Sequence, residues 1–299
     1  MTELHEGRAV LVMAYGTPRG PDDVEAYYTD IRRGRPPPPE LLADLQQRYR
    51  AIGGSPLLEI TQAQASGLGE RLSIPTYLGQ KHAAPFIADA VGAMAKDNVD
   101  RAVGLVLAPH YSKMSVGDYR RRALDAATQG GWTGRLEVVE SWHLEPGYVT
   151  LLARAVKTAV AETVPDATVV FSAHSLPERI LEAGDPYPDQ VHQTAEAVAS
   201  ACSLTNWTVG WQSAGRTTEK WLGPTILEVM EREAAHGAPA VIICPCGFVS
   251  DHLEVLYDVD IEAAQSAKKL GIGFGRTAMP NDEPDFLDIL ATVVRRALN

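Results

Sequence analysis

Short apolar segments alternate with longer amphipathic stretches along the chain. Residues 9–14 form a continuous apolar run that is too short for a helix and is followed by Gly16 and Pro18, a pattern typical of a buried strand. The same pattern predicts further strands at residues 76–78, 102–108, 136–139, 167–172, 207–211 and 240–244. We expect about four strands on each side of residue 140.

Helical patterns with recognisable start signals lie between these runs. The signals are prolines and acidic residues in expected first turns, namely Pro21-Asp22-Asp23, Glu40, Glu145-Pro146, Asp189 and Pro224. Strands that alternate with helices predict parallel sheets joined by crossover helices, which is an α/β fold.

The two halves of the chain echo each other weakly. Residues 107–112 and 171–176 each end a strand in a small residue, a histidine and a hydroxyl. We therefore predict two similar doubly wound domains, 1–142 and 143–283, with the boundary near residues 141–145. The last helix, 284–299, is expected to pack back on the first domain.

Composition narrows the classes of protein. The 299 residues carry a net charge of −11, which argues against a nucleic-acid binder. No uncharged run approaches the roughly 20 residues of a membrane span, and residues 1–8 lack the apolar core of a secretory signal. Three cysteines are too few for a disulfide framework, so we expect a cytoplasmic protein without integral membrane association.

Ligands of open parallel sheets bind beyond the carboxyl ends of the strands. The residues that follow the predicted strands are Tyr15, His110, His174, Gln212, Ser213 and 244–248. The dinucleotide and P-loop glycine motifs are absent after the first strand, so neither of those ligand classes is predicted.

The most informative group of side chains is acidic. Glu254, Asp258 and Glu262 are spaced to form one carboxylate row on a helix, and three like charges need cations or solvent to compensate them. With an imidazole added, such as that of His174, the donor set favours Fe(II), Co(II) or Zn(II). The alternatives are an ordinary solvated helix face and a structural histidine.

A basic group and the cysteines complete the candidates. Arginine forks in the segment with Arg32, Arg33, Arg35 and Arg48, close to Ser55, suit a polyanionic small molecule. The alternative is a solvated face in which these arginines pair with nearby aspartates. The three thiols at 202, 244 and 246 are one short of a four-cysteine site, and we expect a structural role for them.

Ordered motifs along nearly the whole chain resemble those of the ferrochelatases. They lie at residues 11–18, 27–34, 48–57, 172–177, 184–187, 211–213, 221–224 and 247–254. Tyr15, in Ala-Tyr-Gly-Thr-Pro, resembles the Gram-positive branch, whose members act on coproporphyrin III. The protoporphyrin branch usually has Asn-x-Gly-Gly-Pro at this place.

The resemblance implies two Rossmann-like, chelatase-type domains with a porphyrin cleft between them. It implies a lyase of haem biosynthesis that inserts Fe²⁺ into coproporphyrin III to form coproheme. By their positions in the motifs, His174, Glu254 and Tyr15 are expected to be catalytic, and His174, Glu254, Asp258 and Glu262 to bind metal. Expected porphyrin contacts are Tyr15, Ile31, Arg32, Arg48, Ser55 and Tyr119.

Two departures from relatives are a trimmed segment at 69–77 and the lack of a C-terminal extension with cluster cysteines. We therefore expect no [2Fe–2S] cluster and no cofactor beyond the substrate Fe²⁺. A monomer is expected, in transient contact with neighbouring haem-pathway enzymes. The alternatives are a protoporphyrin IX ferrochelatase, a cobalt chelatase, and a porphyrin or haem carrier that would need the arginines but not the carboxylate row.

Overall fold

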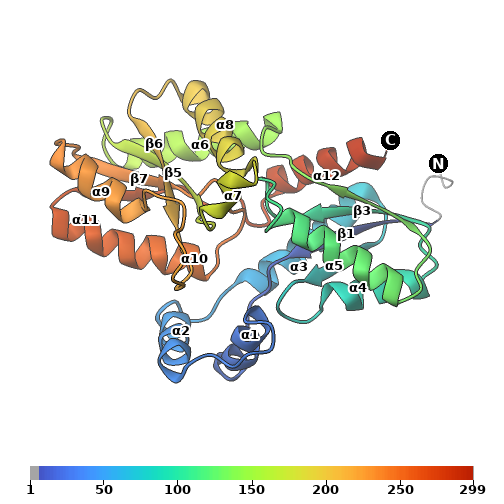
Figure 1. The fold of residues 1–299 in the computed structure, drawn as a ribbon. Coiled ribbons are helices and arrows are strands. Elements are labelled where there is room, and N and C mark those ends of the chain that lie inside the picture. Colours follow the sequence, from blue (N-terminus) through green and yellow to red (C-terminus); the bar gives the residue numbers. More distant parts are fainter. Residues whose placement is uncertain (1–6, 299) are drawn as a thin grey trace.

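The strands form two parallel four-stranded sheets in the computed structural model, which describes residues 7–298 (Figure 1). The first sheet has the order β2-β1-β3-β4, and the second has the order β6-β5-β7-β8. Their bounds are β1 Arg8–Ala14, β2 Thr76–Gln80, β3 Arg101–Val106, β4 Arg135–Val139, β5 Thr168–His174, β6 Trp207–Gln212, β7 Ala240–Cys244 and β8 Gly273–Arg276. The predicted α/β class is confirmed.

Helices cover both sheets, and each predicted helix start lies within two residues of an observed one. The helices of the first half are α1 Val24–Ile31, α2 Pro39–Ala51, α3 Leu57–Leu72, α4 Ile87–Lys96 and α5 Val116–Gln129, with a 3₁₀ turn at Pro21–Asp23. Those that follow are α6 Pro146–Glu162, α7 Arg179–Glu182, α8 Tyr187–Cys202, α9 Ile226–Ala235, α10 Leu253–Leu256, α11 Ala264–Leu270 and α12 Pro284–Leu298. A π-helix at Asp258–Ala263 joins α10 to α11.

All seven strands placed by the apolar pattern are present, and the pattern missed β8. This strand has the sequence Gly-Phe-Gly-Arg and lies at the edge of its sheet, where its residues are only partly covered. An edge strand with two glycines has no apolar run to reveal it.

The hydrophobic core continues from one half into the other. Its largest cluster contains Val12 from β1, Phe171 from β5, and Phe286 and Leu290 from α12, all of them fully buried. Full burial of one such side chain contributes about 1.5–3 kcal/mol. Helix α12 packs against α3, β3 and β4 of the first half and against α6 of the second, so it joins the two.

The domain limits 1–142 and 143–283 stay a prediction. Residues 141–145 connect β4 to α6, and residues 1–6 and Asn299 lie outside the described part of the chain. The absence of a secretory signal was inferred from that N-terminal segment.

The two halves repeat one arrangement of strand, loop and helix. In the first half the backbone amide of Gln80 donates to the carbonyl of Pro85, just before α4. In the second half the amide of Trp211 donates to the carbonyl of Pro224, just before α9. Gln80 and Trp211 therefore hold the same place in the two halves.

The strand register extends this equivalence to the central strands. Ala14 of β1 pairs with Gln80, and Ala173 of β5 pairs with Trp211. The next residues, Tyr15 and His174, are therefore equivalent. The sequence echo that aligned His110 with His174 was wrong as a structural equivalence, because His110 follows β3, a neighbour of the central strand.

His110 instead forms a buried contact between the halves. Its side chain is 1% exposed, and its Nε2 lies 2.9 Å from the hydroxyl of Thr194 in α8. Because that hydroxyl also approaches the Gln190 carbonyl, which only accepts, Nε2 is the donor to Thr194. Nδ1 has no partner, and burial lowers the pKa of His110 to about 3.

We predict that His110 makes the fold acid-sensitive. Unfolded, its pKa is about 6.5, so between pH 6.5 and 3 the unfolded chain binds a proton that the folded chain does not. Stability is therefore lost as the pH falls below 6.5, by about 2 kcal/mol at pH 5 from this group. Urea unfolding of His110→Gln should show a pH dependence reduced by about one proton between pH 6 and 4. An unchanged slope would contradict the assignment.

Candidate active site

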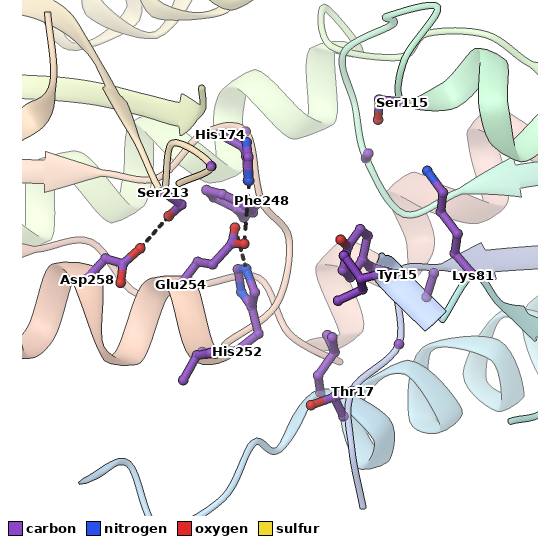
Figure 2. A pocket seen from close by; sticks show the side chains of 18 of the residues that line it. Tyr15, Thr17, Lys81, Ser115, His174, Ser213, Phe248, His252, Glu254 and Asp258 are labelled. Atoms are coloured by element: carbon purple, nitrogen blue, oxygen red, sulfur yellow. Dashed lines mark hydrogen bonds and ion pairs between the residues drawn. The ribbon is translucent and has the colours of Figure 1, made fainter. Parts of the chain in front are cut away.

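A cleft of about 540 Å³ opens at the carboxyl ends of the central strands and is lined by residues of both halves. Figure 2 shows His174 and Glu254 on the wall formed by the second half and Tyr15 on the wall formed by the first. Tyr15 follows β1 directly and His174 ends β5, so the equivalent strand ends of the two halves face each other. A volume of this size is typical of small-molecule sites.

His174 and Glu254 form the central pair of the cleft. His174 Nε2 lies 3.5 Å from Glu254 Oε1, and His252 Nε2 lies 3.7 Å from Glu254 Oε2 (Figure 2). Glu254 therefore stands between two imidazoles. His252 was not among the predicted site residues, although it lies in the motif at 247–254.

The backbone fixes the tautomer of His174. Its Nδ1 is hydrogen-bonded to the carbonyl of Ser175. Because a carbonyl oxygen only accepts, Nδ1 must carry a proton, which leaves Nε2 free to take up another. The nitrogen that faces Glu254 is therefore the one able to act as a base.

Glu254 makes His174 a stronger base. Burial lowers the pKa of His174, and the nearby charge and hydrogen bond of Glu254 outweigh burial, so the pKa is raised. Burial raises the pKa of Glu254, but His174 and His252 hold it well below its usual range. A proton on His174 Nε2 is thus stabilised by the adjacent carboxylate.

Tyr15 presents a neutral phenol to the same space. Tyr15 is 42% exposed, and its ring packs edge-on against His82, with ring centroids 4.7 Å apart. Desolvation, and next the charge of Glu254, raise the pKa of Tyr15 well above its ordinary value. Tyr15 therefore keeps its hydroxyl proton at neutral pH.

The predicted row of carboxylates spans two helical segments. Helix α10 ends at Leu256, and Asp258 and Glu262 both lie in the π-helix. The Ser213 hydroxyl donates to Asp258 Oδ2, and Arg48 approaches both Asp258 (3.1 Å) and Glu262 (3.6 Å). Burial is the main cause that raises the pKa of Asp258 to about 6.

The four predicted metal residues do not form one site. His174 and Glu254 lie together, whereas Asp258 and Glu262 are grouped around Arg48. Among residues 7–298 no three His, Cys, Asp or Glu side chains are arranged to hold a metal ion.

Arg48, a predicted porphyrin contact, has a guanidinium that is already paired with carboxylates. It pairs with Asp44 on its own helix and with the two carboxylates of the π-helix, and it stacks 4.7 Å from the Tyr257 ring centre. Burial lowers its pKa, and these carboxylates outweigh burial and raise it. Arg48 lines the cleft but balances acidic neighbours from both halves.

The other predicted porphyrin contacts divide into two groups. Ile31, Ser55 and Tyr119 line the cleft, as Tyr15 and Arg48 do. Arg32 is not among the lining residues; its guanidinium lies 5.9 Å from the ring centre of Tyr28.

Two further basic residues line the cleft without having been predicted. Lys81 Nζ lies 2.7 Å from Asp118 and 5.0 Å from the Tyr119 ring centre, and Arg216 pairs with Asp44 at 2.9 Å. Lys81 follows β2, and placing the end of that strand at residue 78 instead of Gln80 hid it.

The cysteines have the surroundings of unreactive thiols. Cys244 and Cys246 are fully buried, Cys202 is partly buried, and none of the three is in a disulfide. Burial raises the pKa of Cys244 to about 12, which keeps its thiol protonated.

No helix within the described residues is long and apolar enough to cross a membrane.

Known proteins match this chain over nearly its whole length. The family model described as ferrochelatase matches residues 7–298. The coproporphyrin III ferrochelatase of Halalkalibacterium halodurans is 48% identical over 300 residues, which cover 97% of this chain and 96% of the relative. The coproporphyrin III ferrochelatase of Bacillus subtilis is 47% identical over 303 residues, which cover 97% of each chain.

Solved structures share the fold at low identity. The sirohydrochlorin chelatase SirB from Bacillus subtilis subspecies spizizenii, in complex with cobalt, has a TM-score of 0.62 at 11% identity and covers 97% of this chain and 95% of that one. CbiX, described as the terminal enzyme for biosynthesis of siroheme in denitrifying bacteria, has a TM-score of 0.55 at 17% identity, with coverages of 98% and 100%. These likenesses show the two-domain chelatase fold.

We predict that Arg48 holds down the pKa of Asp258. Replacing Arg48 by Met removes the positive charge 3.1 Å from the carboxylate, so the pKa should rise by about 1–3 units from about 6. Carbon-13 NMR of the aspartate carboxyl groups measures this titration directly. Arg121→Met, on a surface helix where Arg121 pairs with Asp118 and Asp125, is the matched control and should leave Asp258 unmoved. An unshifted titration in Arg48→Met would show that the ion pair does not persist in solution.

Proposed function

The chain belongs to the ferrochelatase family, and from this premise we propose that it inserts Fe²⁺ into coproporphyrin III to form the coproheme of haem biosynthesis. The observation that carries the proposal is the His174–Glu254 pair facing Tyr15 across one cleft. The relatives named coproporphyrin III ferrochelatase support the choice of porphyrin.

The reaction is an exchange of one cation for two protons. The macrocycle loses two pyrrole N–H protons, and Fe²⁺ takes their place on the four ring nitrogens. His174 accepts the two pyrrole protons one at a time at Nε2, because Nδ1 is committed to the Ser175 carbonyl, and it releases each proton to solvent. Glu254 stabilises the imidazolium that forms, and His252 steadies the other carboxylate oxygen.

Tyr15 acts on the opposite face of the ring. Its phenol is neutral, so in that state it approaches the metal centre without adding a charge. We propose that it caps the ring and passes or receives iron there. The two faces of the porphyrin thus meet a base on one side and a protonated phenol on the other.

Asp258 and Glu262 are proposed to hold iron or protons on the way to Glu254. Arg48 compensates them in the structure, and an arriving divalent cation would compete with its guanidinium for the same oxygens. Hard carboxylate oxygens together with an imidazole suit Fe²⁺.

The porphyrin carboxylates are proposed to bind along the wall of the first half. Ser55 and Tyr119 line the cleft there, Ile31 offers apolar contact, and Arg32 and Arg48 supply charge nearby. Charge-assisted hydrogen bonds to such carboxylates contribute about 1.5–3 kcal/mol each when shielded from water.

We propose further that the protein works as a cytoplasmic monomer, in transient contact with neighbouring haem-pathway enzymes. A [2Fe–2S] cluster is not part of the proposal, because Cys244 and Cys246 are enclosed in the core and Cys202 lies on α8 against the Ala153 carbonyl.

We predict that both members of the His174–Glu254 pair are needed for metallation. His174→Ala and Glu254→Gln should each slow metallation at least about a hundredfold, because the base or its stabilising charge is lost. Binding of coproporphyrin III, followed by fluorescence quenching, should stay within about tenfold. His236→Ala, on an exposed histidine outside the cleft, is the matched control. More than a tenth of the wild-type rate in either variant would refute the assignment.

We also predict that the enzyme prefers coproporphyrin III to protoporphyrin IX. Coproporphyrin III carries four propionates, and protoporphyrin IX carries two. Because protoporphyrin IX lacks two of the carboxylate contacts, its kcat/KM should be at least about tenfold lower than that of coproporphyrin III, after discounting for solvent. Tyr119→Phe should narrow this preference, and Tyr77→Phe, which removes a hydroxyl bonded to Asp97 on the surface, should not. Equal turnover of both porphyrins in the same detergent would contradict the preference for coproporphyrin III, although it would still agree with ferrochelatase activity.

A further inference from the structure

Gln212 is a buried side chain directly behind the His174–Glu254 pair. It is the last residue of β6, is 3% exposed, and is not among the residues that line the cleft. The strand register places it beside His174. It therefore does not meet a ligand in the cleft, yet it contacts the segments that carry both members of the pair.

The amide of Gln212 is held at both ends. Its Nε2 donates to the backbone carbonyl of Glu254 at 2.8 Å. Its Oε1 accepts from the Ser172 hydroxyl at 2.7 Å, two residues before His174 on β5. Because one end only donates and the other only accepts, these partners fix the orientation of the amide.

The backbone of Gln212 adds a third contact to the same segment. Its carbonyl accepts from the amide of Ser175 at 2.7 Å. That residue also supplies the carbonyl that fixes the His174 tautomer. One residue thus holds β5 on both sides of His174 and, through its side chain, the turn that carries Glu254.

The position of Glu254 depends on contacts from other segments because its own helix is short. Helix α10 has four residues, and it passes directly into the π-helix. A single turn has little stability of its own, so contacts from elsewhere must set its position.

We propose that Gln212 is a positioning residue that sets the distance between His174 Nε2 and Glu254. The inference rests on the proposed function of this pair in iron insertion. Displacements of about 1 Å in a catalytic constellation cost up to about a hundredfold in rate, so a hydrogen bond that holds the turn affects kcat without touching the porphyrin.

The test begins with Gln212→Met, which has a similar length and removes both side-chain hydrogen bonds. We expect kcat for Fe²⁺ insertion to fall at least about tenfold, while KM for coproporphyrin III stays within about twofold. Nitrogen-15 NMR of His174 at one fixed pH should show shifted imidazole signals, since its contact with Glu254 changes. This second readout does not depend on turnover.

Tyr148→Phe is the matched control. The Tyr148 hydroxyl also donates from a fully buried side chain to a backbone carbonyl of the second half, that of Cys246 at 2.8 Å. Its loss should lower the melting temperature as Gln212→Met does, with kcat within about twofold and His174 signals unmoved. Equal effects of the two variants on kcat and on the His174 signals would overturn the proposal.

Ser172→Ala is a milder variant that serves if Gln212→Met does not fold. It leaves the donor to Glu254 in place but frees the other end of the amide. We expect kcat about threefold lower and a smaller shift of the His174 signals. Wild-type kcat together with unmoved signals would overturn the proposal. If the wild type fails to metallate coproporphyrin III while Gln212→Met still shifts the His174 signals, the positioning role stands and the proposed function fails.

Discussion

The charge of Glu254 is the interaction on which the cleft depends. A carboxylate in this desolvated place is costly alone, and two imidazoles at 3.5 and 3.7 Å compensate it. The same charge then acts on its neighbours: it helps to raise the pKa of His174, of Tyr15 and of Asp258. This one anion therefore shifts the pKa values of three neighbouring groups in the same direction.

Repetition of the fold explains why the two walls can differ in chemistry. Tyr15 and His174 occupy the same position at the ends of equivalent central strands, so the geometry of the fold brings both to one cleft. Their surroundings then separate their roles. The imidazole lies beside a carboxylate that favours its protonation, whereas the phenol has a raised pKa and stays neutral. In the proposed reaction, a porphyrin between them would meet a base on one face only.

The sequence predicted the parts of this arrangement that depend on local pattern. Apolar runs located seven strands, and the motifs located His174, Glu254 and Tyr15. The pattern failed at β8, an edge strand with the sequence Gly-Phe-Gly-Arg, and it did not reveal that Asp258 and Glu262 lie in a π-helix. Contacts between distant segments, such as those of Arg48 with Asp258 and of Gln212 with Glu254, leave no mark in local sequence.

Arg48 compensates the charge of three neighbouring carboxylates. Asp44, Asp258 and Glu262 would repel one another around a shared space, and the guanidinium between them supplies the compensating charge from the opposite half of the chain. Asp258, with a pKa raised to about 6, relieves the remaining repulsion by taking up a proton as the pH falls. The fold is therefore balanced without a metal ion, and a divalent cation that enters must displace either a proton or the guanidinium. In the proposed function, this competition favours transient occupancy by iron on its way to Glu254 over a resident ion.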